Sequence, residues 1–248
     1  MKKLNLFTLT VATGALLASP AVIRAGIVGS PHDFSGESWS SRPGDPNTIC
    51  SVCHTPHDAD PNAGPLWNHS MSGGGFTMYN NANSPAASLA GSLQQDASPA
   101  ASSLACLSCH DGTVAVNAYG GSAGTADTII TNSASLTKDL SHSHPISLTY
   151  DANLVGNGSQ QDKWLYPPDS TTVQAPVNLG GAFVSGNNMT INGFLLGGNH
   201  RLECRSCHDV HNQEGSPFDL NNNPKLVKIV GTDSANNGSL LCRACHNK

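Results

Sequence analysis

The sequence predicts a mostly coil protein with short α-helices, minor β hairpins and a core that side chains alone do not supply. Only 5% of the 248 residues are aromatic and 12% are charged, whereas Gly contributes 25 residues and Pro 15. A chain of this composition has too little Leu, Ile and Phe for a large conventional core. In addition, one short cysteine–histidine motif occurs four times, with a spacing that fits a turn of helix.

All eight cysteines belong to this motif, C-x-x-C-H. Its copies are Cys50–Cys53–His54, Cys106–Cys109–His110, Cys204–Cys207–His208 and Cys242–Cys245–His246. Two thiols three positions apart can each form a thioether with one haem vinyl group, and the adjacent His then lies under the iron. Disulfides, zinc sites and redox dithiols are the competing interpretations. None of these requires His after the second Cys in every copy. The sequence therefore predicts four covalent c-type haems, and a multihaem cytochrome c fold whose core the haems form.

A six-coordinate haem iron needs a second axial ligand, and His residues outnumber Met residues as candidates. Beyond the four motif histidines, seven of the 11 His remain, whereas the chain after residue 25 has Met only at Met71, Met78 and Met189. This excess favours bis-His ligation, which gives lower reduction potentials than His/Met ligation. The favoured distal ligands are His57, His211, His32 and His144, and His69 is a further candidate. His142 and His200 are expected to be solvated or to bind haem propionates.

Local sequence supports the favoured ligands. His57 and His211 each lie three residues after a motif His, so each can reach a neighbouring iron more easily than the far face of its own motif's haem. His32 lies near the start of the predicted mature chain, from where it can reach a haem in its own chain or in another. Pro145 restricts His144 to extended backbone, which suits a fixed ligand on a loop.

The N-terminus has the features of a secretory signal peptide. Lys2 and Lys3 precede an apolar stretch of small residues, and cleavage is expected after Ala25. An uncleaved membrane anchor is the alternative, although the apolar run is short and interrupted by Thr and Ser. Cleavage removes three basic residues and no acidic one, so the formal charge changes from -5 to -8. An exported, acidic chain with no further spanning segment is predicted, and a nucleic-acid partner is not expected.

The arrangement of the motifs predicts one tetrahaem domain at 26–248, because the first and third copies carry the extra His and the second and fourth do not. A haem pair at 26–120 and another at 200–248 are expected on either side of a Gly/Ser/Thr-rich insert at 121–199. The insert is expected to be a solvent-exposed covering layer. Short β character is found at Thr128–Thr131, Ile146–Tyr150 and Asn188–Leu196.

Helices are expected next to the motifs. Pro99 can occupy the first helical position before the second motif, and Asp111–Gly112 can end that helix. Ser239 is a plausible N-cap for a helix through the fourth motif. Trp39, Trp67 and Trp164 are expected to pack against haem edges.

Several segments resemble a known family. These are SPHDF, CSVCHTPH, PLWNH, CLSCHDGTVA, SHPISLTYD, CRSCHDVHN and CRACHN. They resemble the exported multihaem cytochromes of metal-reducing bacteria, and the haem count and length are similar to the OmcE-type outer-surface tetrahaem cytochromes. The resemblance implies a largely coil fold, stacked bis-His haems and polymerisation into extracellular filaments, or nanowires. It also implies that one distal His comes from the adjacent subunit, with His57 the first candidate for that role and His32 the second.

The functions considered differ in what surrounds the irons. An electron conduit in a filament, passing electrons to other redox proteins or extracellular acceptors, is the main hypothesis. A discrete periplasmic shuttle is the second, although shuttles often carry a Lys-rich docking face and this chain is acidic. A multihaem reductase is the third; it would need an iron position open to substrate, and the spare histidines do not require one.

Overall fold

The computed structural model describes residues 27–40, 48–79, 94–155, 165–169, 190–211, 226–229, 232–233 and 238–246. The predicted signal peptide at 1–25 and Trp164 lie outside these residues. Most of the described chain is coil, and its helices and strands are short. Among the described residues, no helix combines the length and the apolar character needed to cross a membrane.

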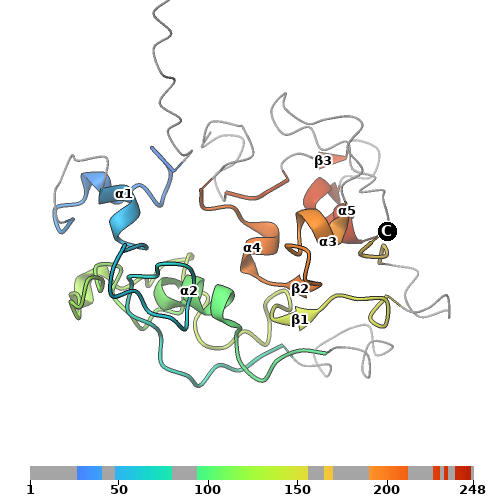
Figure 1. Ribbon diagram of the computed structural model, residues 1–248, viewed down its shortest axis with the longest axis horizontal. Coiled ribbons are helices and arrows are strands. Elements are labelled where there is room, and N and C mark those ends of the chain that lie inside the picture. The colour runs from blue at the N-terminus through green and yellow to red at the C-terminus, as the bar shows by residue number, and fades with distance from the viewer. Residues whose placement is uncertain are drawn as a thin grey trace, which may run out of the picture.

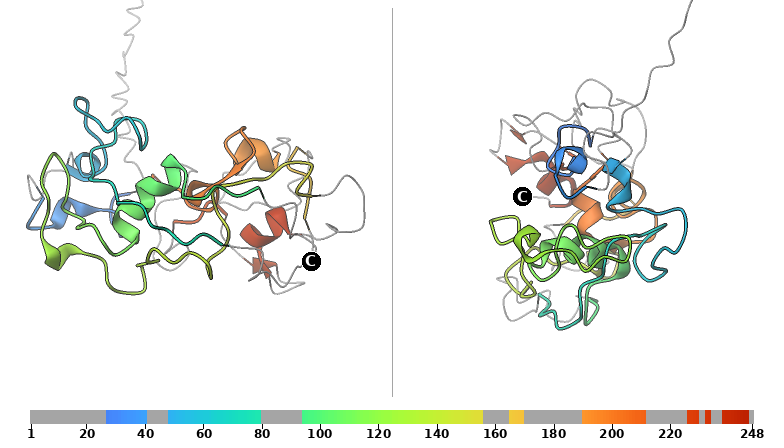
Figure 2. Two further views of the ribbon diagram at one scale, coloured as in Figure 1. Left: turned by 90° about the horizontal axis from the view of Figure 1, so that it is seen from below. Right: turned by 90° about the vertical axis from the view of Figure 1, so that its left-hand side faces the viewer.

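The helices lie at the motifs, as the sequence predicts. They are α1 (Thr48–Ser51), α2 (Ala101–His110), α3 (Ile191–Phe194), α4 (Cys204–Cys207) and α5 (Leu240–Cys245), with 3₁₀-helices η1 (Phe34–Gly36) and η4 (Ala126–Thr128). Each of α1, α2, α4 and α5 contains at least one motif cysteine. These four helices follow one another in chain order along the long axis of the molecule (Figures 1 and 2). The motifs are thus arranged in a row.

The ends of α2 and α5 are close to those expected. The helix α2 begins two residues after Pro99, because Ala100 is extended and its N–H donates to Ser147 Oγ at 2.9 Å. It ends at Asp111, followed by Gly112 at a φ of +74°. Ser239 occupies the predicted N-cap position of α5. Asp111 and Gly112 therefore mark the end of α2 as predicted, whereas Pro99 lies before α2 and not at its first position, and the Ser239 side chain makes no capping hydrogen bond.

The strands are two residues long and form two pairs. In the first, β1 (Leu148–Thr149) runs antiparallel to β2 (Arg201–Leu202), and in the second, β3 (Thr232–Asp233) runs antiparallel to β4 (Gly238–Ser239). The β1 strand falls within the predicted segment Ile146–Tyr150, but its partner is distant in sequence, so this pair is not a local hairpin. It attaches the insert to the segment that leads into α4.

Two other β predictions differ from the structure. The described part of Asn188–Leu196 contains α3, because Thr190 caps that helix by accepting a hydrogen bond from the Gly193 N–H at 2.9 Å. In Thr128–Thr131 the chain leaves η4 and forms only an isolated bridge between Ile129 and Ala115. In the described parts of these two segments, β-branched residues predicted strands that the structure does not contain.

The insert supplies much of a side-chain core at 148–155 and 191–196, whereas residues 121–138 are largely exposed, so a solvent-exposed covering layer describes only part of it. A cluster of buried apolar residues contains Leu148, Tyr150, Leu154, Val155, Ile191, Leu195, Leu196, Leu202, Ile229, Leu240 and Ala244. It packs around α3 and α5, next to the fourth motif (Figure 1). Burying this surface stabilises the end of the molecule that carries α5.

Candidate haem-binding site

The structure brings three motif histidines next to three of the favoured distal histidines. The ring centroids of His54 and His211 are 6.0 Å apart, those of His110 and His32 are 6.0 Å apart, and those of His246 and His144 are 6.3 Å apart. In each pair, one ring follows a C-x-x-C motif and the other comes from a distant part of the chain.

This separation suits an iron between two imidazoles. With metal–nitrogen bonds of about 2 Å, and each nitrogen about 1 Å from its ring centre, two axial imidazoles have centroids about 6 Å apart. The interplanar angles of the three pairs range from 18° to 81°. Such variation is compatible with axial ligation, because each ring can rotate about its bond to the iron. A pair of imidazoles is also all that a haem requires from the side chains besides its two thioethers.

Hydrogen bonds to Nδ1 prepare three of these rings for a metal. Nδ1 of His54 lies 3.1 Å from the carbonyl oxygen of Pro65, Nδ1 of His110 lies 2.8 Å from that of Ala134, and Nδ1 of His144 lies 3.0 Å from that of Pro145. A carbonyl accepts only, so Nδ1 carries the proton in each contact. The neutral ring then has its lone pair on Nε2, the arrangement typical of metal-bound His.

His32 is a neutral imidazole for a different reason. Burial, and then the neighbouring His110 and His208, together lower its pKa to about 4. Its Nδ1 is buried without a hydrogen-bond partner in the described structure. A neutral ring with an unsatisfied polar atom is costly in a protein interior unless a ligand or water completes it. The ring is therefore well suited to a site completed by a bound group.

The thiols of successive motifs are neighbours. Burial, and then the nearby Cys53, raises the pKa of Cys109 to about 12. A hydrogen bond with Cys204 raises the pKa of Cys106. Burial, followed by Cys242, raises the pKa of Cys207. The first motif therefore lies beside the second, the second beside the third and the third beside the fourth, the order in which α1, α2, α4 and α5 are arranged.

The structure also shows how the cysteines and other possible metal ligands are arranged. All eight cysteines lie in the described residues, and none of them is in a disulfide. No group of three or more His, Cys, Asp or Glu residues capable of holding a metal ion occurs in the part of the chain that the structure describes. A structural zinc site needs four such ligands, whereas a c-type haem needs two thiols and two imidazoles.

His69 has a different environment from the favoured ligands. It is buried, its Nε2 lies 3.0 Å from Ala115 O and 3.2 Å from Val116 O, and its Nδ1 lies 2.9 Å from Ser70 O. Both ring nitrogens therefore face backbone carbonyl oxygens, and Nε2 also lies 3.4 Å from Cys109 Sγ, so protein atoms already surround both nitrogens. These contacts argue against His69 as a further distal ligand and make it a clamp between two loops.

The remaining histidines lie outside the three pairs. His200 is held by Asp169, with its Nε2 2.8 Å from Asp169 Oδ2. His57 and His142 are exposed. No ring contact of His57 occurs within the described residues. The second candidate for a ligand donated to another subunit, His32, instead lies against His110 of its own chain.

Three exposed apolar residues lie close along the backbone to a paired histidine or its neighbour. Val28, Leu66, Leu136 and Val210 are the large apolar residues that are exposed in the described chain. Val210 adjoins His211, and Leu136 donates its N–H to His110 O at 2.6 Å. Leu66 accepts a hydrogen bond from the N–H of Thr55, the residue after His54.

Two tryptophans differ in their surroundings. The ring of Trp67 lies 6.2 Å from that of His54, and its Nε1 is buried without a partner in the described structure. Trp39 packs on Phe34 at 5.6 Å and on Tyr119 at 6.3 Å, and within the described residues its ring contacts no paired His. Trp67 therefore lies beside a motif His, whereas Trp39 lies among other aromatic rings; contact with a haem edge stays a prediction for both. The buried indole N–H was not foreseen, because local sequence does not reveal burial.

Comparison of the sequence with protein-family models and with curated proteins found no match. The assignment of the site therefore depends on the four motifs, on the three histidine pairs and on the contacts that orient their rings.

Proposed function

We propose that this chain is an exported four-haem c-type cytochrome that carries electrons and is not an enzyme. The observation that carries the proposal is the set of three histidine pairs, each combining a motif His with a distant His at the separation of two axial ligands. Random placement of histidines in a coil-rich chain gives no reason for a motif His in every pair. The neutral Nδ1–H tautomers support the same conclusion.

The residues would hold each haem by two thioethers and one or two imidazoles. The distal ligand of the first motif's haem (Cys50, Cys53 and His54) is His211. That of the second motif's haem (Cys106, Cys109 and His110) is His32, and that of the fourth motif's haem (Cys242, Cys245 and His246) is His144. Cys204, Cys207 and His208 hold the remaining haem. When bound, each haem supplies a one-electron ferric/ferrous couple, and bis-imidazole ligation keeps its potential low. Because the thiols of successive motifs are neighbours, the protein keeps the four groups in one continuous series.

A subunit of an extracellular filament, as in the OmcE-type cytochromes that the sequence resembles, is the favoured form of this carrier. His57 is exposed, and its spacing after His54 repeats that of His211 after His208. His211 reaches the ring of another motif, so the equivalent His57 is suited to an iron outside its own motif. A neighbouring copy of the chain would present one. The chain would then form homopolymers, which pass electrons to other redox proteins or extracellular acceptors. A periplasmic shuttle is the alternative.

Mass spectrometry of the purified, exported chain tests the central proposal. The expected mass is that of residues 26–248 plus four covalent haems, with a reduced absorption spectrum of low-spin c-type haem. A colourless chain whose cysteines are joined to one another or to zinc would refute the proposal. Carbon monoxide binding to one haem of the wild-type ferrous protein would instead favour the reductase, because it reports an open iron position.

Negative-stain microscopy tests the filament. The wild-type protein is expected to form filaments, and His57→Ala is expected to shorten or abolish them. His142→Ala is the matched control, because it removes another exposed imidazole. If the wild-type protein forms only separate globular particles at every concentration, the filament is wrong and the shuttle is favoured.

A further inference from the structure

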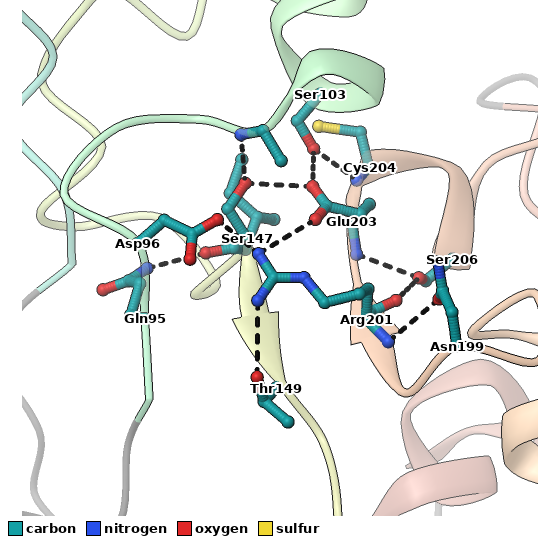
Figure 3. A network of polar contacts seen from close by, with 12 residues as sticks. Gln95, Asp96, Ser103, Ser147, Thr149, Asn199, Arg201, Glu203, Cys204 and Ser206 are labelled. Atoms are coloured by element: carbon teal, nitrogen blue, oxygen red, sulfur yellow. Dashed lines mark hydrogen bonds and ion pairs between the residues drawn. The ribbon is translucent and has the colours of Figure 1, made fainter.

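A buried carboxylate lies between the second and third motifs. Glu203 directly precedes Cys204, is the N-cap residue of α4, and is only 3% exposed. The helix α4 packs against α2, which carries the second motif. Figure 3 shows the Glu203 side chain directed toward Ser103 of α2 and Ser147 of the insert. A carboxylate so deeply buried needs partners, since desolvating a charge is costly.

Hydroxyl groups from two segments supply these partners. Glu203 Oε2 accepts hydrogen bonds from Ser103 Oγ at 2.5 Å and from Ser147 Oγ at 2.9 Å (Figure 3). Ser103 Oγ in turn accepts from the N–H of Cys204 at 3.1 Å. Both serines are 0% exposed, so water does not compete for these contacts. The carboxylate thus connects α2, the insert and the first residue of α4.

The positive charge near Glu203 is shared with another acid. Arg201 Nη2 lies 3.6 Å from Glu203 Oε1 and also bonds Asp96 Oδ2 (Figure 3). Two carboxylates therefore face one guanidinium, and the cluster has a net negative charge. Asp96 is 46% exposed on its side chain, so water screens its charge far better than that of Glu203. Of the two carboxylates, Glu203 is therefore the one whose negative charge water does not screen.

This cluster lies against the thiols of two motifs. Ser103 is three residues before Cys106, so the two side chains lie on the same face of α2. The thiols of Cys106 and Cys204 are in hydrogen-bonding contact with each other. The first cysteine of the second motif therefore touches the first cysteine of the third. Ser103 and Glu203 hold both helices at this point.

We propose that Glu203 is a positioning residue that locks Cys106 against Cys204 and lowers the reduction potentials of the two haems attached there. The proposal rests on the assignment of c-type haems to these motifs. A buried negative charge stabilises the ferric state relative to the ferrous state, because oxidation adds a positive charge nearby. The hydrogen bonds fix the distance over which this charge acts.

Glu203→Gln and Ser103→Ala separate the two parts of the proposal. The first variant removes the charge but retains an oxygen that can accept from Ser103. The second retains the charge but removes the hydroxyl that joins Cys204 to Glu203. Asp127→Asn is the control, because it makes the same carboxyl-to-amide change at an exposed position. Each protein is expressed as the exported holoprotein, and mass spectrometry counts its haems before any other measurement.

Redox titration followed by visible absorption is the main measurement. In Glu203→Gln the midpoint potentials of two of the four haems are expected to rise, while Asp127→Asn is expected to follow the wild type. Ser103→Ala is expected to weaken the Soret circular-dichroism couplet that reports the coupling of neighbouring haems, with a smaller change in potential. If Glu203→Gln does not acquire its haems, the Soret circular-dichroism couplet of Ser103→Ala decides the test.

The results distinguish this proposal from the assignment on which it rests. If Glu203→Gln carries four haems and titrates like the wild type, Glu203 has no electrostatic role and the proposal is wrong. If Ser103→Ala leaves the Soret couplet unchanged, the positioning role is wrong. If the wild-type chain carries no haem, the proposed function itself fails, and the mass spectrum shows this before any titration.

Discussion

Replacing His211 by Ala tests the histidine pairs most directly. The ring of His211 lies 6.0 Å from that of His54 and comes from the other end of the described chain. His211→Ala leaves the thiols of both nearby motifs and His54 itself in place. If His211 is an axial ligand, the variant retains four covalent haems, and one iron loses its second imidazole.

The structure also predicts the size of the effect. His211 takes part in one pair, so one iron of the four, or about a quarter of the haem, becomes five-coordinate in the ferrous state. Carbon monoxide then binds with one more equivalent per chain than in the wild type, because the iron between His54 and His211 gains an open position. Flash photolysis and a titration followed in the Soret band measure this number. The low-spin electron paramagnetic resonance signal is expected to lose about a quarter of its intensity, because the other three irons keep their ligands.

His200→Ala is the matched control for His211→Ala. It removes an imidazole whose Nε2 is bound to Asp169 at 2.8 Å, in the segment just before the third motif. This variant is expected to bind as much carbon monoxide as the wild type. The pairing would be refuted if His211→Ala bound no more than the wild type while carrying four haems, or if His200→Ala bound one equivalent more. Equal binding by both variants would show that loss of any imidazole loosens the structure, and the ring distances would then identify no ligand.

Three further substitutions test the surroundings of the sites. His69→Gln is expected to leave carbon monoxide binding at the wild-type level but to lower the free energy of unfolding by about 1–3 kcal/mol, because the carbonyls of Ala115 and Val116 lose a buried donor; binding of one equivalent would make His69 a ligand after all. Leu107→Ala, at a 0% exposed position between the cysteines of the second motif, is expected to lower that free energy by about 2–5 kcal/mol in denaturant titrations. A loss below about 0.5 kcal/mol would mean that Leu107 is not packed as the structure has it. Gly112→Ala is expected to lower the free energy of unfolding by about 1–2 kcal/mol or more in the same titrations, because φ is +74° and the added Cβ would lie 2.7 Å from Ser135 Oγ. An unchanged denaturant midpoint would contradict this backbone conformation.

The sequence contained the chemistry of the site but not its pairing. The motif spacing identified the thiols and the proximal histidines, since both must lie within a few residues of each other to hold one haem. The extra His of the third motif, His211, and His144 before its Pro are favoured distal ligands that the structure brings to motif histidines, whereas the extra His of the first motif, His57, is exposed. Which distal His meets which motif depends on the folding of distant segments. No local pattern in the sequence contains that information.

Burial was the other property that local sequence did not reveal. His69 and His32 stand in similar polar surroundings in the sequence, yet the nitrogens of one face carbonyl groups and the other has an unsatisfied Nδ1. Glu203 looks like an ordinary helix-capping acid until Ser103, one hundred positions earlier, is seen to donate to it. The Ser- and Gly-rich composition of the insert concealed a few well-spaced apolar residues that form a core. Each of these errors concerns a long-range contact.

Long-range pairing also explains how a coil-rich chain can have one structure. His32 and His110, His144 and His246, and His54 and His211 are separated by about 80, 100 and 160 residues, and a cross-link that closes a loop of about 100 residues removes roughly 4–5 kcal/mol of chain entropy from the unfolded state. The buried apolar cluster lies beside the fourth motif, so the first two motifs depend more strongly on such links. Their neighbouring loops are held by short-range turns and by clamps such as His69. Ligation at these histidines would therefore stabilise the fold in addition to setting the potential, and the half of the molecule around α1 and α2 would lose its structure first when the links are removed.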